Sequence, residues 1–383
     1  MKLMNNQFKP KKLKIATIVG TRPEIIRLSE VIKKLDKYFD HSLIHTGQNF
    51  DYELNEIFFD DLGLKQPKFF LNATKLSNSS SETIGNIISS SHKILAKIQP
   101  DAVLLLGDTN SCLAAISAKK LKIPIFHFEA GNRCYDQRVP EEVNRKLVDH
   151  ISDINLTYSS IAREYLLREG FPQDRIIKLG SPMHEVLIAN ESKIHASSIL
   201  SELKLVKQKY FLVSAHREEN IDSGNRFMDL LRILEKVQST FSLPIIISTH
   251  PRTRKRIKSL KYKASDKLIF MKPFSFSDYI SLQKNSLITL SDSGTITEES
   301  SILGFKALNI RESHERPEGM EEATVPLVGF NENKILNGIK ILLTQKYIPS
   351  IVEDYQTTNV SDKVVRIILS YIDYVNRVVW KKY

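Results

Sequence analysis

The feature that most constrains the fold of this chain is a regular alternation of short apolar runs with longer amphipathic stretches. The apolar runs are rich in β-branched residues and end at glycine or polar residues, which is typical of buried strands. Near-continuous apolar strands separated by helices predict a parallel sheet with helices on both faces. In the first half the predicted strands are 13–20, 42–46, 102–107, 124–129, 154–158 and 176–180, and the predicted helices are 23–35, 81–98, 111–120, 140–151 and 161–169.

The pattern is interrupted once and then resumes. Residues 187–209 lose the strand signal and are predicted to form a linker with a short helix. At 383 residues the chain is also too long for one ordinary hydrophobic core. We therefore predict an α/β fold of two similar domains separated by a cleft. The second array has predicted strands at 211–215, 244–248, 267–271, 287–291 and 306–310, and predicted helices at 225–241, 295–303, 334–343 and 360–380.

Composition limits the class of protein and its compartment. Apolar residues make up 42% and charged residues 26% of the chain, as in a soluble globular protein. The sequence has no apolar run of about 18 residues and no apolar signal segment, so it predicts neither a membrane span nor secretion. Cys112 and Cys134 lack metal-ligand spacing, which favours reduced cytoplasmic thiols over a disulfide or a zinc site.

The net charge of +11 favours anionic ligands. The basic runs at 9–14 and 252–256 contain no interleaved aromatic residues, which a base-stacking surface would need. The charge therefore indicates a solvated surface or attraction for a small phosphate ester, rather than nucleic-acid binding.

One charged segment, 126–145, follows a predicted strand. The strand breaks at Gly131, and a helix begins at Pro140, so charged side chains gather beyond the carboxyl end of the strand, where open α/β sheets bind ligands. His127, inside the strand, is predicted to be a core residue. A surface loop can carry such charge without a function, so the segment alone leaves both interpretations open. The gathered residues are Glu129, Arg133, Asp136, Arg138, Glu141, Glu142 and Arg145.

The second half contains a candidate anion site. It has neither G-x-G-x-x-G nor a Walker sequence, so a tightly held NAD or an ATP phosphate loop is not expected. Residues 291–295 end a strand and open a helix, whose free amides and dipole favour an anion, and Gly294 permits close approach. The alternative is that Ser293 or Thr295 is a simple helix cap.

Other polar residues follow further predicted strands. Thr21 and Glu24 fit a capping box, whereas Arg22 at the same turn suits a phosphate or carboxylate. Asp108 either caps the next helix or faces the cleft. His216 is the histidine best placed for chemistry, because it ends the first strand of the second half. The first half thus supplies three carboxylates, and the second half supplies a histidine, an arginine and an anion site. This division predicts a diphosphate-bearing ligand that lies across the cleft.

With these residues in place, the chain resembles the non-hydrolysing UDP-N-acetylglucosamine 2-epimerases over nearly its whole length. The resemblance implies two Rossmann-like domains in the glycosyltransferase-B arrangement, a homodimer, and neither a cofactor nor a metal. It assigns the acid/base carboxylates to a domain at 1–186 and UDP binding to a domain at 187–359, with a C-terminal helix at 360–383 that can pack back on the first. The matching motifs are GTRPE (20–24), GDTN (107–110), HFEAGNR (127–133), PEEVNR (140–145), AHREEN (215–220), SDSGTITEE (291–299) and ERPEG (315–319).

The resemblance also implies roles for single residues. Asp108, Glu129 and Glu141 become the acid/base carboxylates, and His216 becomes the partner of the diphosphate leaving group. The remaining residues are implied to contact the substrate, which is a UDP-activated N-acetylated sugar. They are Arg22, Arg27, Arg145, Tyr279 near the uracil, Ser293 and Gly294 at the pyrophosphate, Glu299 at the ribose, and Arg316 facing a phosphate or the sugar.

These residue types suit epimerisation by elimination. No carbonyl activates the C2 proton of the sugar, so simple deprotonation is implausible. Anti elimination of UDP gives a 2-acetamidoglycal, and UDP then adds back with protonation on the opposite face. This needs a base and an acid on opposite faces, and cations that retain the diphosphate.

Departures from the usual family pattern predict the substrate branch. Loop 132–139 differs from the usual Leu-Arg-Thr…Ser-Pro type, Arg27 stands where lysine is common, and Thr295 replaces a glycine. Residues 46–51 replace the segment tied to allosteric UDP-GlcNAc binding. Together these resemble the branch that forms UDP-N-acetyl-L-fucosamine from its L-talo C2 epimer, for capsule or O-antigen. The alternatives are the UDP-GlcNAc/UDP-ManNAc pair, a UDP-sugar glycosyltransferase and a basic nucleic-acid-binding protein.

Overall fold

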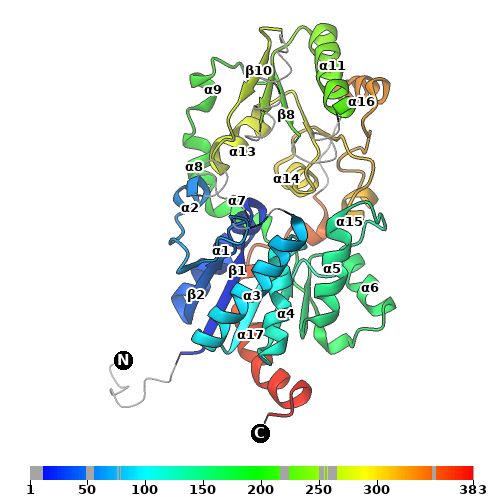
Figure 1. The fold of residues 1–383 in the computed structure, drawn as a ribbon. Helices are drawn as coiled ribbons and strands as arrows, with labels where there is room; N and C mark the ends of the chain where they lie inside the picture. Colours follow the sequence, from blue (N-terminus) through cyan, green and yellow to red (C-terminus); the bar gives the residue numbers. More distant parts are fainter. Residues whose placement is uncertain are drawn as a thin grey trace, which may run out of the picture.

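The computed structural model describes residues 12–48, 56–75, 77, 79–215, 224–249, 254, 257, 265–346 and 351–382. It contains two parallel sheets, one in each half of the molecule, with helices packed around them (Figure 1). The predicted pair of α/β domains is therefore confirmed. The predicted boundaries between the parts, at 186/187 and 359/360, stay predictions.

The first sheet has seven parallel strands in the order β3-β2-β1-β4-β5-β6-β7. All five residues of β4 are buried, as expected for a central strand covered on both faces. The six predicted strands of this half are found with ends within two residues of the prediction, whereas β3 and α2 were not predicted. The elements are β1 (Lys14–Val19), α1 (Arg22–Tyr38), β2 (Asp40–His45), α2 (Glu56–Leu62), β3 (Phe69–Phe70), α3 (Ser80–Ile98), β4 (Ala102–Leu106), η2 (Asn110–Ala114), α4 (Ala115–Lys120), β5 (Ile125–Phe128), α5 (Pro140–Ile151), β6 (Ile154–Thr157), α6 (Ser160–Arg168), η3 (Gln173–Arg175) and β7 (Ile176–Lys178).

The second sheet has five parallel strands in the order β10-β9-β8-β11-β12. Its predicted strands are also found, but helix α13 was not predicted. The elements are β8 (Phe211–Ser214), α11 (Gly224–Phe241), β9 (Ile245–Ser248), β10 (Leu268–Met271), α13 (Phe276–Asn285), β11 (Ile288–Ser291), α14 (Thr295–Leu303), β12 (Ala307–Asn309), α15 (Pro317–Glu321) and α16 (Glu332–Thr344).

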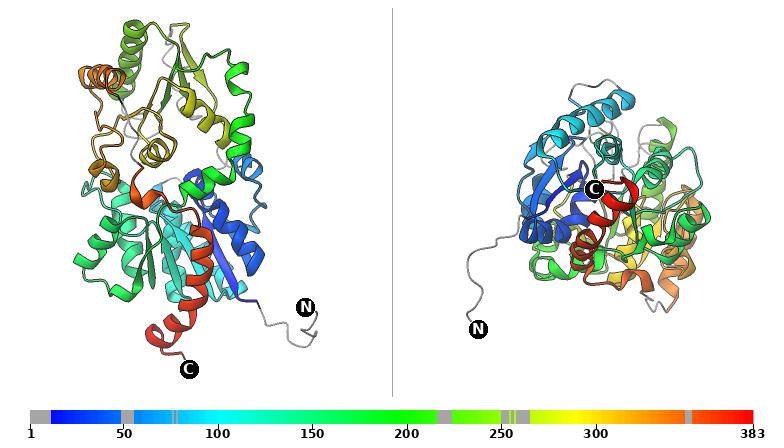
Figure 2. Two further views of the ribbon diagram at one scale, coloured as in Figure 1. Left: turned by 180° about the vertical axis from the view of Figure 1, so that it is seen from behind. Right: turned by 90° about the horizontal axis from the view of Figure 1, so that it is seen from below.

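The chain passes between the two halves twice. The outward passage contains three short helices where the sequence predicted one: α7 (Met183–Ala189), α8 (Glu191–Ala196) and α9 (Ile199–Glu202). After η4 (Glu353–Tyr355), helix α17 (Val360–Tyr374) returns and ends in the π-helical turn Val375–Val379. Its apolar face shares one buried cluster with α1 and the first sheet, and Figure 2 shows it beside that sheet.

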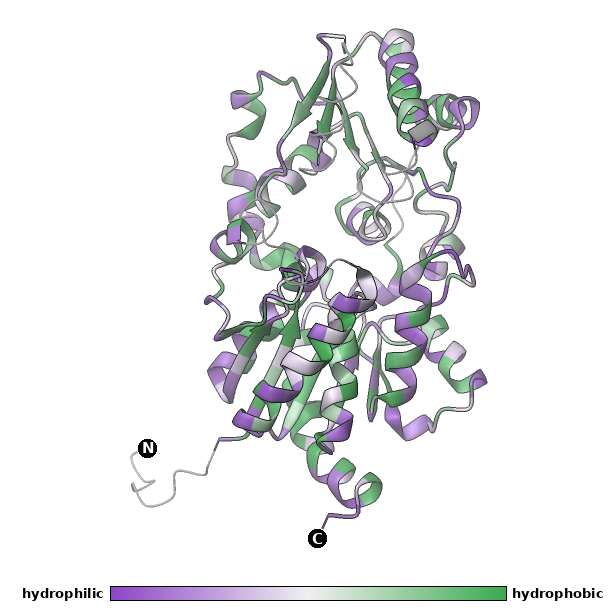
Figure 3. Cartoon of the chain, viewed as in Figure 1, coloured by the Kyte–Doolittle hydropathy of each residue, from purple (hydrophilic) through white to green (hydrophobic). Residues whose placement is uncertain are grey.

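Apolar residues concentrate on the strands and on the inward faces of the helices, while the outward faces are polar (Figure 3). Burial of this apolar surface is the main force that holds each domain together. Among the described residues, no helix is long and apolar enough to cross a membrane.

Candidate active site

The carboxyl ends of the two sheets meet at a cavity between the domains. The strand order reverses at β1 in the first sheet and at β8 in the second, and ligands of parallel sheets bind beside such switch points. Residues at or just after the carboxyl ends of β1, β8, β9 and β11 line the cavity, so both domains contribute to it. The lining residues are Arg22, Pro23, Ile26, Arg27, Phe58 and Met183 from the first half and Ser214, Ser248, Phe274, Phe276, Tyr279, Ser293, Thr295 and Glu299 from the second.

Arg22, Tyr279 and Glu299 give this cavity a charged and aromatic side. The Arg22 guanidinium lies 5.7 Å from the centre of the Phe58 ring. Burial lowers the pKa of Arg22, and the neighbouring Tyr279 and Glu299 oppose this shift, so the side chain stays a cation. Burial also raises the pKa of Glu299. A 2.7 Å hydrogen bond that Gln283 Nε2 donates to its carboxylate opposes this rise. The three predicted substrate-binding residues thus lie together.

The predicted anion site at 291–295 lies at the start of α14. Gly294, not a serine or threonine, occupies the N-cap position, and no side-chain cap is present there. The hydroxyl of Ser293 lies 2.9 Å from Thr295 Oγ1, and the backbone N–H of Ser293 donates to Ser291 Oγ at 3.1 Å. A Cβ at Gly294 would lie 3.4 Å from Glu315 Oε2, so the backbone here is closely approached. The Ser293 hydroxyl also accepts a hydrogen bond from the backbone N–H of Thr295, the first residue of α14, at 3.3 Å, so the helix-cap alternative for Ser293 is supported.

Glu129 follows β5 and is held between two arginines. Its backbone φ is +64°, a left-handed conformation that is uncommon for residues other than glycine. Its carboxylate lies 2.5 Å from Arg27 Nη1, accepts a hydrogen bond from Arg316 Nη2, and accepts a third from Asn132 Nδ2 at 3.1 Å. Burial raises the pKa of Glu129, but the charges of Arg27 and Arg316 outweigh burial and hold it below its usual value.

Glu298, on α14, completes this ion-pair network and was missed by the sequence reasoning. Its carboxylate lies 3.1 Å from Arg27 Nη2 and 3.3 Å from Arg316 Nη2, and it also accepts a hydrogen bond from Ser181. Arg316 pairs with Glu129 and Glu298, and its expected contact with a phosphate or the sugar stays a prediction. The signal available in the sequence was a second glutamate beside Glu299 in a helix that has no other charged residue.

Asp108 follows β4 and pairs with Arg145 of α5. Thr109, not Asp108, caps the next helix, since Thr109 Oγ1 accepts from the backbone N–H of Ser111 at 3.3 Å. The helix-cap alternative for Asp108 is therefore wrong. Burial raises the pKa of Asp108 to about 6, although the charge of Arg145 opposes the shift. Arg145, predicted to contact substrate, is itself buried and also lies 3.3 Å from Glu315.

The two adjacent glutamates that begin α5 differ in their contacts. Glu142 is fully buried and accepts hydrogen bonds from the backbone N–H of Cys134 at 3.1 Å and of Tyr135 at 3.2 Å, so it fixes the loop. Glu141 is half-buried, and no hydrogen bond or ion pair to it occurs within the described residues. Of the pair, Glu141 is the one whose carboxylate has no structural partner there.

The sequence made predictions for two histidines, and the structure tests the one for His127. His127 is fully buried, with Nδ1 2.9 Å from Asp149 and Nε2 2.8 Å from the carbonyl oxygen of Gly107, which confirms it as a core residue. His216 lies outside the described residues. Glu24 accepts hydrogen bonds from the backbone N–H of Gly20 and Thr21, as the predicted capping box requires. Within the described ranges no group of acidic, histidine or cysteine side chains could hold a metal ion.

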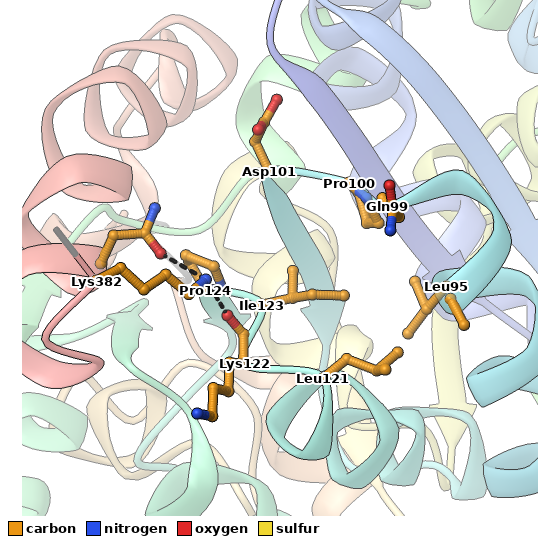
Figure 4. A pocket seen from close by; sticks show the side chains of 11 residues that line it. Leu95, Gln99, Pro100, Asp101, Leu121, Lys122, Ile123, Pro124 and Lys382 are labelled. Carbon is orange, nitrogen blue, oxygen red and sulfur yellow. Dashed lines mark hydrogen bonds between the residues drawn. The ribbon is translucent and has the colours of Figure 1, made fainter.

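A second cavity, of about 320 Å³, lies at the opposite edge of the first sheet. Figure 4 shows that it opens where the chain enters β4 and β5, between Asp101, Lys122 and Lys382. None of the predicted site residues that the structure describes lines this second cavity, because they lie beyond the carboxyl ends of the strands. We therefore take the cavity between the domains as the candidate active site.

Comparison with known proteins identifies the family. The family described as UDP-N-acetylglucosamine 2-epimerase matches residues 33–369. The chain belongs to the UDP-N-acetylglucosamine 2-epimerase family. It is therefore an isomerase. The expected likeness in fold is confirmed by the structure of UDP-N-acetylglucosamine 2-epimerase from Rickettsia bellii, which is 49% identical, covers 97% of this chain and 100% of that one, and has a TM-score of 0.88.

Two further relatives differ in the substrate they are named for. The UDP-N-acetylglucosamine 2-epimerase of Methanocaldococcus jannaschii is 36% identical over 87% of this chain and 93% of its own length. Its structure in complex with UDP-GlcNAc and UDP has a TM-score of 0.87 and covers 94% of this chain and 100% of that one. The UDP-2,3-diacetamido-2,3-dideoxy-D-glucuronate 2-epimerase of Pseudomonas aeruginosa is 32% identical over 86% of this chain and 92% of its own length. These relatives are all named as 2-epimerases, but they are named for different UDP-sugars. Membership of the family therefore does not identify the sugar.

Proposed function

We propose that this epimerase inverts C2 of a UDP-2-acetamido sugar by anti elimination of UDP and re-addition. One observation carries the proposal. Two carboxylates, Asp108 and Glu129, follow neighbouring strands and have pKa values shifted in opposite directions. The cavity between the domains, with the Arg22 cation, also contains groups that suit a nucleotide diphosphate.

The reaction requires two groups in opposite protonation states. A base takes the C2 proton, the electrons of the C–H bond form the C1=C2 double bond, and UDP leaves with the electrons of the C1–O bond. UDP then adds back to C1 while an acid protonates C2 on the other face. Positive charge develops near the ring during elimination, so neighbouring carboxylates also stabilise the transition state. Carboxylates with separated pKa values suit these two tasks.

The cavity residues divide between the parts of the nucleotide. Arg22, Ser293 through its hydroxyl, and the backbone amide of Gly294 hold the diphosphate, because a cation and a helix N-terminus both attract phosphate oxygens. Glu299 accepts from the ribose hydroxyls, and Tyr279 lies at the base. The role of His216 at the leaving group stays a prediction from the family pattern. Arg27, Arg145 and Arg316 act on the carboxylates, since their guanidiniums are already paired with them.

For the sugar we propose the UDP-GlcNAc/UDP-ManNAc pair first, because most of the similar proteins are named for UDP-N-acetylglucosamine. The UDP-2-acetamido-2,6-dideoxy-L-talose/UDP-N-acetyl-L-fucosamine pair is the second candidate. The observation in its favour is Asn132, which stands where the family usually has leucine and donates to Glu129 at 3.1 Å. The unusual loop therefore reaches a proposed catalytic carboxylate, where it can influence sugar choice.

Proton NMR of each purified UDP-sugar with the enzyme, without added cofactor, tests the proposal. We expect a new C2 epimer and a higher kcat/KM for UDP-GlcNAc than for the L-talo/L-fuco pair. A higher value for the second pair would select the second candidate. Conversion of neither pair would exclude both candidate sugars. Transfer of the sugar to an added acceptor, without an epimerised UDP-sugar, would contradict C2 epimerisation and favour a glycosyltransferase.

We also propose that the epimerase works as a cytoplasmic homodimer, which is what the family pattern and the composition imply. Light scattering on the purified protein should give twice the mass of the 43.9 kDa chain. A monomer that is fully active at assay concentrations would contradict the dimer.

A further inference from the structure

Two neighbouring residues of the second domain, Glu315 and Arg316, reach two different carboxylate systems of the first. Arg316 donates to Glu129, which follows β5. Glu315 Oε1 lies 3.3 Å from Arg145 Nη2, and the same nitrogen donates to Asp108, which follows β4. Both residues are buried just before helix α15. One short segment thus touches the surroundings of both candidate acid/base groups.

We propose that Glu315 and Arg316 are positioning residues that give Asp108 and Glu129 opposite protonation states, so that Glu129 is the base and Asp108 the acid. The inference rests on the proposed C2 epimerisation, which needs one protonated and one ionised carboxyl group at the same time. It goes further by assigning the two roles and by naming the residues outside the first domain that set them.

The surroundings of Glu129 favour its ionised form. Cations reach it from both domains: Arg27 from α1 and Arg316 from the second domain. The guanidinium of Arg316 also lies 5.7 Å from the centre of the Tyr158 ring, within the range of a cation–π contact. These cations outweigh the effect of burial on the pKa of Glu129, so it remains a carboxylate. The charged or titratable groups that face it are Arg27, Arg316, Glu298, Glu315, Tyr158 and Asp108.

The surroundings of Asp108 raise its pKa to about 6, so it keeps its proton to a higher pH than Glu129 does. Among the described residues, the cation that pairs with Asp108 is Arg145, which is shared with Glu142 at 3.1 Å and with Glu315 at 3.3 Å. After burial, which is the main cause of the raised pKa of Asp108, Glu315 is the first of the negative charges that raise it further. The charged or titratable groups that face it are Arg145, Glu315, Glu129, Glu141, Glu24 and Cys112.

Both contacts cross from the second domain to the first. Separation of the domains would remove Arg316 from Glu129 and Glu315 from Arg145, and the difference between the two carboxyl groups would shrink. In the joined arrangement Glu129 takes the C2 proton and Asp108 delivers a proton to the opposite face. Exchange of one proton with water then returns both groups to their starting states, so no other reactant is needed.

The pH dependence of kcat/KM separates this role from a purely structural one. Activity requires one proton on the pair, so the profile falls at high pH when Asp108 ionises and at low pH when Glu129 is protonated. Glu315→Gln should move the alkaline limb to lower pH, and Arg316→Met should move the acid limb to higher pH, each by about one unit. Arg316→Lys, which keeps the charge, should leave the acid limb near its wild-type position.

Two surface variants serve as matched controls. Glu312 and Arg226 pair with each other at 3.1 Å and contact neither carboxylate, so Glu312→Gln and Arg226→Gln should leave both limbs in place. The positions of the limbs do not depend on how much protein is folded, which removes stability from the comparison. The inference would be overturned if both limbs stayed at their wild-type pH in Glu315→Gln and Arg316→Met. It would also be overturned if the acid limb of Arg316→Lys lay as far from the wild-type position as that of Arg316→Met.

A second readout separates this inference from the proposed function. Carbon-13 NMR of the labelled carboxyl groups, assigned with Asp108→Asn and Glu129→Gln, follows both titrations in the free protein. We expect Asp108 to titrate above Glu129, and Glu315→Gln and Arg316→Met to bring the two closer. An enzyme that epimerises no UDP-sugar would contradict the proposed function alone. Carboxyl titrations that are unchanged in the variants would contradict the control by Glu315 and Arg316, whatever the activity.

Discussion

Replacing Glu129 with glutamine should remove most of the catalysis while the protein still folds. The Glu129 carboxylate lies between the guanidiniums of Arg27, at 2.5 Å, and Arg316. Glutamine has the same shape but cannot accept a proton as a base. Loss of a general base typically lowers kcat by about 10²–10⁴-fold, or about 3–5 kcal/mol in the barrier.

The expected loss of stability is smaller than a broken buried ion pair would suggest. Removing one partner of such a pair usually costs about 3–5 kcal/mol, because a charge is left buried without a partner. Here Glu298 still lies 3.1 Å from Arg27 and 3.3 Å from Arg316, so both arginines keep a carboxylate. We therefore expect Glu129→Gln to lower the free energy of unfolding by about 1–3 kcal/mol.

Glu298→Gln is the matched control for this prediction. It makes the same chemical change in an equally buried glutamate that pairs with the same two arginines. We expect a similar loss in urea unfolding but a decrease in kcat of no more than about 10-fold, since our mechanism gives Glu298 no proton to transfer. Equal losses of kcat in the two variants, or a Glu129→Gln enzyme within about threefold of wild type, would refute the reasoning.

Three other predictions follow from single features of the structure. Burial raises the pKa of Asp108 from 3.8 to about 6, so its contribution to folding is greatest at low pH and is lost as pH rises through 6. In urea titrations, the free energy of unfolding of wild type relative to Asp108→Asn should therefore fall by about 2 kcal/mol between pH 4 and pH 7.5. A Cβ on Gly131 would lie 2.3 Å from the carbonyl oxygen of Ala162 at a φ of +80°, so Gly131→Ala should cost about 3 kcal/mol or more, whereas Gly170→Ala, with φ of +87° and nothing within 4 Å, should cost about 1–2 kcal/mol. Arg22→Met should raise the Kd for UDP by calorimetry about 10–100-fold, and an unchanged Kd would remove Arg22 from the diphosphate site.

Elements with strong local signals were predicted well. Helix α5 has the bounds that the sequence predicted, because Pro140 fixes its first turn and its apolar residues recur with helical spacing. Strand β4 is apolar throughout and β5 is apolar except for His127, as central positions in a parallel sheet favour. Helix α13 was missed because its apolar stripe is weak, although Ser275 caps it by accepting from the backbone N–H of Asp278.

The sequence predicted several residues that line the cavity, but not the ion pairs between the charged side chains. Arg22, Tyr279, Ser293 and Glu299 do line one cavity, since each follows a strand or lies on a helix at the same edge of its sheet. The ion pairs between domains could not be read from the sequence, because they depend on how the second domain docks on the first. Glu298 shows this: no local pattern distinguishes it from Glu299, yet it contacts Arg27 across the interface and Arg316 within its own domain.

The most direct test of the central claim is the fate of the hydrogen at C2. UDP-GlcNAc, and the L-talo/L-fuco pair in parallel, should be turned over in deuterated water without added NAD, and the products analysed by NMR and mass spectrometry. Elimination and re-addition predict solvent deuterium at C2 of every epimerised molecule. Epimerised product that retains the original hydrogen at C2 would contradict the roles proposed for Asp108 and Glu129.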